Sequence, residues 1–146
     1  MHHVAIMNKR LGFLEKIQTG EKTIESRWLN TQRTPYRNVQ TGDTLFFKNT
    51  SELVSIKAKV NKVLEFENLS PYKINDIIKK YGKDIGIHKK EIQKFFLTVQ
   101  NKKYCVLIFI KNPLVIKPFH IDKRGYGMQS AWISVKNINQ IKTKKI

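Results

Sequence analysis

The sequence predicts a single α+β domain built on a small curved sheet or barrel, and three observations support this. The 146 residues are 40% hydrophobic, which is enough for one globular core and leaves little room for a second. Short segments with strand-like patterns occur along the whole chain. Helical patterns are inserted among them, without the regular strand–helix alternation of a parallel α/β sheet. We expect one domain over residues 1–141 and a basic tail at 142–146.

The chain opens with a strand and a helix. Residues 3–7 are mostly apolar and predict a first strand. Apolar residues then recur at helical spacing over 11–17, and Gly20 stands where a helix often ends in the left-handed conformation. The chain therefore leaves its first helix through a glycine and enters an extended segment at 23–28.

Strands continue through the middle of the chain. A Gly-Asp turn at 42–43 precedes a short apolar strand at 45–47. Residues 53–63 alternate between apolar side chains and Ser, Lys or Asn. This strand should be half buried, with a basic outer face that carries Lys57 and Lys59.

Two helices and several extended segments complete the chain. Ser70 and Pro71 form a typical helix start, and the apolar stripe that follows ends at Gly82. A second helical stripe covers 92–99. A charged, glycine-containing loop is expected at 122–127. Extended segments are expected at 104–110, at 113–118, which Pro113 and Pro118 bracket, and at 131–135.

Positive charge is the strongest global signal. Lys and Arg number 28 against 11 Asp and Glu, which gives a formal net charge of +17. Such a surface repels itself unless a polyanion neutralises it, and nucleic acid is the commonest polyanion. A compositional bias towards lysine is the alternative explanation. Because no strongly amphipathic basic helix stands out, we expect no membrane partner.

The single cysteine, Cys105, excludes an internal disulfide framework and favours a reducing compartment, so we expect the cytoplasm. It lies in the most apolar run of the chain, where a thiol is usually buried and unreactive. The four histidines show no metal-binding spacing, and the sequence has no Walker-type phosphate loop. We expect neither a metal nor a cofactor.

The most informative stretch is GEKTIESRW at 20–28. In an extended segment Glu25 and Arg27 share a face and can pair, whereas Lys22 needs a bend to reach Glu25. An ordered carboxylate can accept the exocyclic amine of a base, and a nearby cation can hold phosphate. The alternative is an exposed Glu25–Arg27 pair, worth under about 1 kcal/mol and without functional meaning.

The Gly-x-Lys-x-x-Glu-x-Arg string at 20–27, which follows a helix and precedes the Gly-Asp turn at 42–43, resembles the ASCH domain of the PUA-like superfamily. Residues 103–119 resemble the long strand and proline-bearing crossover of that fold, and 128–132 resemble its closing loop and strand. The resemblance implies a small β-barrel with helices packed around it and a cleft beside the Gly-x-Lys segment. PUA-like relatives bind RNA, and some read modified bases, so the resemblance implies RNA ahead of single-stranded DNA as the partner.

On this resemblance a single nucleotide, modified or unmodified, would enter the cleft. An indole at the cleft edge can stack on a base, although each tryptophan could instead cap the core. The nucleotide-binding residues would be Lys22, Glu25, Arg27, Trp28, Ser130 and Trp132. Exposed cations would contact the nucleic-acid backbone, namely Arg33, Arg37, Lys57, Lys59 and Arg124.

The resemblance also leaves an enzyme open, because a few ASCH proteins are implicated as hydrolases, including one type that deacetylates N4-acetylcytidine. Those relatives use a lysine, a threonine three residues later and a distant glutamate. Lys22 matches the lysine, but Glu25 occupies the threonine's position, and only Asp84 offers itself as the distant acid. Lys22 and Glu25 would be the catalytic residues of such an amidohydrolase. Arg27 disfavours this, since it would lower the pKa of Glu25. A protein-recognition adaptor is a third option.

Overall fold

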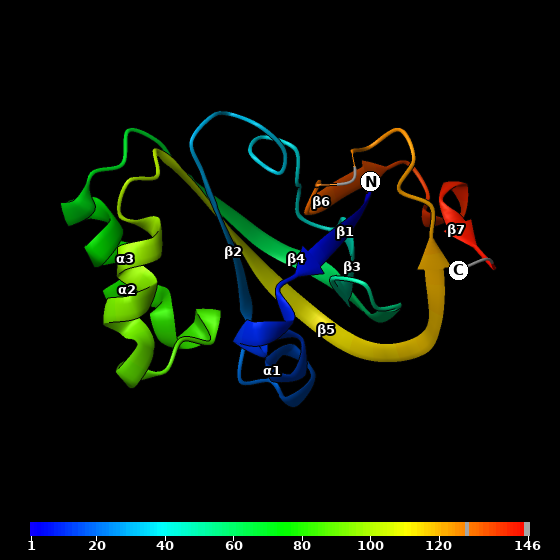
Figure 1. Ribbon diagram of the computed structural model, residues 1–146, viewed down its shortest axis with the longest axis horizontal. Helices are drawn as coiled ribbons and strands as arrows, with labels where there is room; N and C mark the ends of the chain where they lie inside the picture. The colour runs from blue at the N-terminus through cyan, green and yellow to red at the C-terminus, as the bar shows by residue number, and fades with distance from the viewer. Residues whose placement is uncertain (128, 145–146) are drawn as a thin grey trace.

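The structure is a computed structural model that describes residues 1–127 and 129–144. Its elements form one curled sheet with two helices packed together at one end and a third near the middle (Figure 1). In chain order they are β1 (His2–Met7), η1 (Lys9–Leu11), α1 (Phe13–Thr19), β2 (Ile24–Leu29), β3 (Thr44–Asn49), β4 (Val54–Phe66), α2 (Pro71–Ile85), η2 (Lys89–Glu91), α3 (Ile92–Val99), β5 (Tyr104–Ile121), β6 (Trp132–Val135), η3 (Ile138–Gln140) and β7 (Lys142–Thr143).

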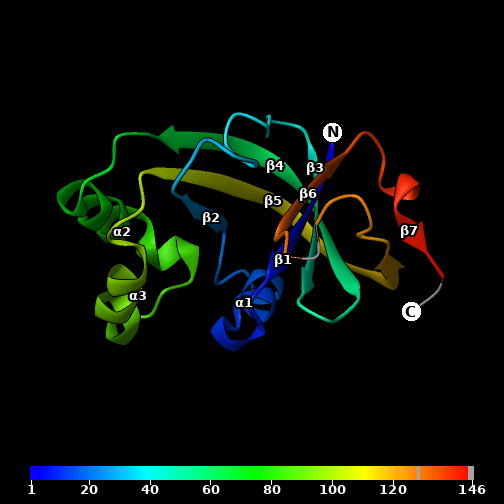
Figure 2. The same cartoon turned by 45° about the horizontal axis from the view of Figure 1, so that its top comes forward.

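The strands lie in the order β2-β5-β4-β3-β1-β6, and β7 pairs with the far end of β5. β1 and β3 run parallel, whereas the other pairs are antiparallel. The long strands β4 and β5 shift register at three places, and such irregularities bend and twist a sheet. The sheet therefore curls into a half-barrel, whose arch is visible in Figure 2. The expected α+β class with a curved sheet is confirmed.

β5 is longer than the sequence suggested. The segments expected at 104–110 and 113–118 form one strand that runs through Pro113 and Pro118 to Ile121. Two of the register shifts against β4 fall around these prolines, between Lys111 and Leu114 and between Val115 and Phe119. Proline lacks a backbone donor and is tolerated at such bulges, so it did not end the strand.

Two further boundaries differ from expectation. The helix expected to end at Gly82 continues to Ile85, because Gly82 is buried inside the helix and Gly86, with φ 98°, ends it in the left-handed conformation. Lys142 and Thr143, expected as the start of a basic tail, instead form β7. Residues 145–146 lie outside the described residues, as does Met128.

The core lies on both faces of the sheet. The apolar face of β4 (Val54, Ile56, Ala58 and Val60) is buried as predicted, and Cys105 is fully buried. Burial raises the pKa of the Cys105 thiol, which agrees with an unreactive core cysteine. Within the described residues, no helix has both the length and the apolar character that a membrane span requires.

Candidate nucleic-acid interface

Three charged residues of the 20–28 stretch meet in the interior at the start of β2. Glu25 is at the centre: its Oε1 lies 3.1 Å from Lys22 Nζ, and its Oε2 accepts a hydrogen bond from Arg27 Nε at 2.7 Å. Only 3% of Glu25 and 1% of Lys22 are exposed, so the alternative of an exposed pair is wrong. The bend that the sequence required follows Gly20, which has φ 83°.

Lys22 fastens β2 to the end of α2. Its ammonium donates to the backbone oxygens of Ile24 at 2.6 Å and Ile85 at 2.7 Å, and Glu25 is its third partner. The ring of Phe13 covers the ammonium at 4.2 Å. Burial lowers the pKa of Lys22, and Glu25 opposes that shift. Because three acceptors surround the three N–H groups, the charged form is held in place.

Glu25 is held as an anion. Burial would raise the pKa of its carboxyl, but Lys22 and Arg27 outweigh this and bring the pKa below its ordinary value of 4.5. A carboxylate stabilised in this way is a weak base at neutral pH. The geometry therefore favours a structural or ligand-orienting role for Glu25 over that of a general base.

Arg27 links the network to β1 and to the segment before β6. Its guanidinium donates to the backbone oxygens of Ala131 at 3.1 Å and Ile6 at 3.3 Å, and it lies 5.3 Å from the centre of the Trp132 ring. Ser130 is close by and donates to the backbone oxygen of Trp132 at 2.8 Å. The fold thus brings Arg27, Ser130 and Trp132 together, although Trp132 is only 4% exposed.

Trp28 lies on the other side of β2 from Arg27, because successive strand residues face opposite ways. Its ring meets Phe95 of α3 edge-on at 6.0 Å, and its Nε1 donates to Ser26 Oγ at 3.0 Å. Trp28 packs against the core cluster under α2 and α3. The six residues expected around one nucleotide are therefore divided between two sides of the strand.

The five cations expected to contact a nucleic-acid backbone are all exposed, and they lie on three segments: the β2–β3 connection (Arg33, Arg37), the outer face of β4 (Lys57, Lys59) and the loop after β5 (Arg124). Arg124 is paired with Asp122 at 2.7 Å, which lowers the pKa of that carboxyl to about 2. Lys59 donates to Thr44 Oγ1 at 2.8 Å. The charge of Arg124 is thus partly neutralised within the protein.

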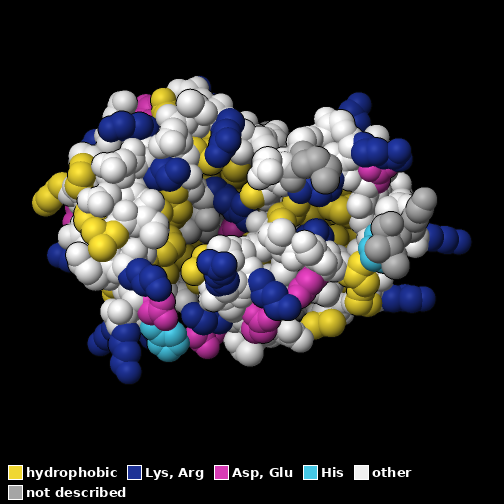
Figure 3. All heavy atoms as spheres, viewed as in Figure 1, with side chains coloured by type: hydrophobic (Ala, Val, Ile, Leu, Met, Phe, Trp, Pro, Cys, Tyr) yellow, Lys and Arg dark blue, Asp and Glu magenta, His cyan; other side chains and the backbone are white. Residues whose placement is uncertain are grey.

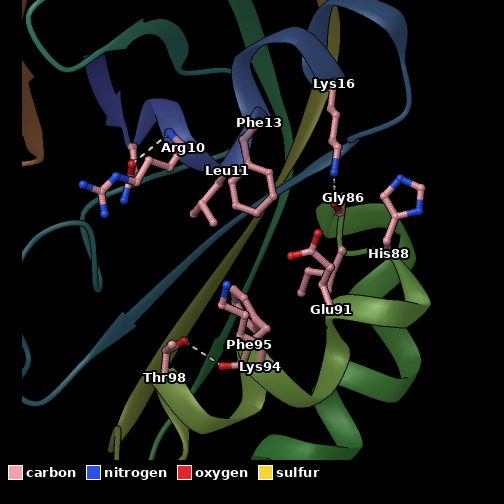
Figure 4. Close-up of a pocket in the computed structure, with 12 residues that line it drawn as sticks. Arg10, Leu11, Phe13, Lys16, Gly86, His88, Glu91, Lys94, Phe95 and Thr98 are labelled. Atoms are coloured by element: carbon pink, nitrogen blue, oxygen red, sulfur yellow. Dashed lines mark hydrogen bonds between the residues drawn. The ribbon is translucent and has the colours of Figure 1, made fainter.

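A cavity of about 530 Å³ lies beside the ion network, between α1 on one side and the end of α2 with α3 on the other (Figure 4). Its lining includes the cations Arg10, Lys16 and Lys94 and the rings of Phe13 and Phe95. The space-filling view in Figure 3 shows the molecule hollowed between these two halves, with Lys and Arg side chains around the hollow.

None of the six predicted nucleotide-binding residues lines this cavity; Lys22 lies behind it, covered by the Phe13 ring. The lining residues were missed because Phe13 and Phe95 belong to helical apolar stripes that read as core. The one sequence feature that could have indicated this cavity is the presence of Lys16 and Lys94 on the same two predicted helices as these rings. No group of three or more His, Cys, Asp or Glu that could hold a metal ion occurs among the described residues.

Comparison with solved structures shows that the fold of this chain is similar to that of ASCH proteins. The structure of ASCH from Zymomonas mobilis superposes with a TM-score of 0.67 at 16% identity, covering 95% of this chain and 91% of that one. A single-residue variant of the same protein gives 0.67 at 14% identity, with 95% and 93% covered. The expected resemblance to ASCH domain proteins is confirmed as a likeness of fold.

A second type of protein shares part of the fold. The N-terminal domain of Staphylothermus marinus McrB superposes with a TM-score of 0.53 at 16% identity, over 80% of this chain and 75% of that one. No protein-family model matches the sequence, and curated proteins give no significant match.

Proposed function

We propose that this protein is a nucleic-acid-binding module of the ASCH type, which holds RNA on its basic surface and takes a single nucleotide into its concave region. The observation that carries the proposal is the formal net charge of +17 on a protein that has a cavity between α1 and α3. Cations on the rim of a concave region concentrate the field that attracts a polyanion. Two statements remain predictions: that the partner is RNA rather than DNA, and that the protein is cytoplasmic.

The ion network would act as the frame of this interface. Lys22 uses its donors within the protein, so its role is to fix β2 against the end of α2. Arg27 and Ser130 would form an edge outside the cavity that meets a base of the bound RNA, and the buried Trp132 ring would support the Arg27 guanidinium, whose Cζ lies 5.3 Å from the centre of that ring. The exposed cations on the β2–β3 connection, β4 and the loop after β5 would follow the phosphates.

Salt dependence of RNA affinity tests the proposal. With a fluorescent single-stranded RNA followed by anisotropy, five phosphate contacts predict a loss of about 100-fold between 50 and 200 mM salt. Replacing Lys57 and Lys59 together by alanine should lower the log–log salt slope by about 1.4. The matched control replaces Lys79 and Lys83, exposed on α2, and should leave the slope nearly unchanged. A wild-type affinity that barely changes with salt would contradict the proposal.

A further inference from the structure

We propose that the cavity between α1 and α3 binds a nucleotide that carries a terminal phosphate monoester. This inference rests on the proposed function, because it names the part of a nucleic acid that the cavity receives. None of the residues predicted from the sequence motif lines the cavity. It is therefore a site separate from the edge that Arg27 and Ser130 form.

The size and the aromatic walls of the cavity suit a nucleoside. Its volume of about 530 Å³ falls within the range usual for small-molecule sites, about 300–1,000 Å³. Phe13 enters from α1 and Phe95 from α3, so the two rings line opposite walls (Figure 4). Both are half-buried, so part of each ring remains available. A base between such rings gains stacking contacts that do not depend on its identity.

The charge of the lining selects for a phosphate monoester. Arg10, Lys16 and Lys94 face a single carboxylate, Glu91, so these four side chains leave an excess of two positive charges. A phosphate monoester carries about −1.5 to −2 at pH 7, whereas a phosphodiester carries about −1. The monoester is thus the better match for this lining.

The donors needed to hold that phosphate are available. Among the described residues, neither Arg10 nor Lys94 forms an ion pair with a carboxylate. Lys16 donates to the backbone oxygen of Gly86 at 2.7 Å, which uses one of its three N–H groups. In Figure 4 the amine of Lys94 points towards the space in front of Phe13, where it can meet a ligand.

Binding of mononucleotides tests the inference. Uridine 5′-monophosphate, uridine and inorganic phosphate would each be titrated into the intact protein and followed by NMR chemical shifts. The monophosphate should bind at least about tenfold more tightly than uridine, the gain expected from one charge-assisted hydrogen bond. Lys94→Ala should lose about tenfold in monophosphate affinity. The matched control, Lys90→Ala, removes an exposed lysine of η2 that does not line the cavity and should bind like the wild type.

A second variant separates the base from the phosphate. Phe95→Leu keeps an apolar side chain but removes the ring, so it should weaken binding of uridine 5′-monophosphate while leaving the affinity for inorganic phosphate unchanged. Equal affinity for uridine and its monophosphate, or wild-type binding by Lys94→Ala, would overturn the inference. If single-stranded RNA still binds with steep salt dependence in that case, the proposed function stands and only the cavity's role fails. If RNA does not bind even at low salt, the proposed function itself fails.

Discussion

Replacing Glu25 by glutamine should destabilise the protein strongly. Glutamine keeps the shape of the side chain but removes the charge that Lys22 and Arg27 share. Two cations would then remain in or near the interior without an anion, since Lys22 is 1% exposed and the Arg27 side chain 14%. Removing one partner of a buried ion pair leaves an uncompensated charge, which typically costs about 3–5 kcal/mol.

That loss can be converted into a change of melting temperature. For a chain of this size, about 1 kcal/mol shifts the midpoint by roughly 2–4 °C, so the variant should melt about 6–20 °C below the wild type. Urea unfolding followed by circular dichroism would measure the free energy of unfolding directly. The matched control is Glu21→Gln, four residues earlier and exposed, which should change stability by less than about 0.5 kcal/mol. A loss under about 1 kcal/mol for Glu25→Gln would refute the reasoning, because it would mean that the network is solvated.

Three further predictions concern other parts of the structure. The pKa values of His2 and His3 are lowered from 6.5, chiefly by burial, so the unfolded chain binds more protons than the folded chain below that pH. The free energy of unfolding should therefore fall as the pH drops from 7.5 to 5.5, by at most about 1.4 kcal/mol per pH unit for each histidine. Urea midpoints that do not change over this range would contradict this. Gly86→Ala should destabilise the protein more than Gly20→Ala. Both glycines have positive φ, but only a Cβ at Gly86 would crowd another atom, Lys22 Cβ at 3.3 Å. Equal urea midpoints for the two variants would show that this crowding is relieved without cost. Incubation with N4-acetylcytidine should give no deacetylation above a buffer blank, because the ammonium of Lys22 is fully hydrogen-bonded and cannot act as a base. Deacetylation detected by chromatography would instead favour the hydrolase alternative.

The sequence predicted the elements whose signals are local. The alternation along 54–60 depends only on which face of one strand is buried, and the structure confirms it. Gly20 ends its helix because no other residue adopts positive φ so easily, which a spacing argument can detect. The pairing of Glu25 with Arg27 followed from their shared face on one strand, and it is present.

The features that the sequence did not predict depend on distant segments. Lys22 finds an acceptor on Ile85, and Arg27 finds acceptors on Ile6 and Ala131, which no local pattern could place nearby. The same holds for the cavity, whose two walls come from α1 and α3, helices that lie far apart in the sequence. β5 was divided in two because a proline alone reads as a strand end, whereas a bulge in the pairing with β4 accommodates it.

The most direct test is the structure of the protein bound to a short single-stranded RNA with a 5′-phosphate, by crystallography or by NMR. We expect the terminal nucleotide between α1 and α3, in contact with Phe13 and Lys94, and the following phosphates near exposed Lys and Arg side chains. An RNA bound away from the hollow, with the cavity residues unchanged from the free protein, would contradict the account.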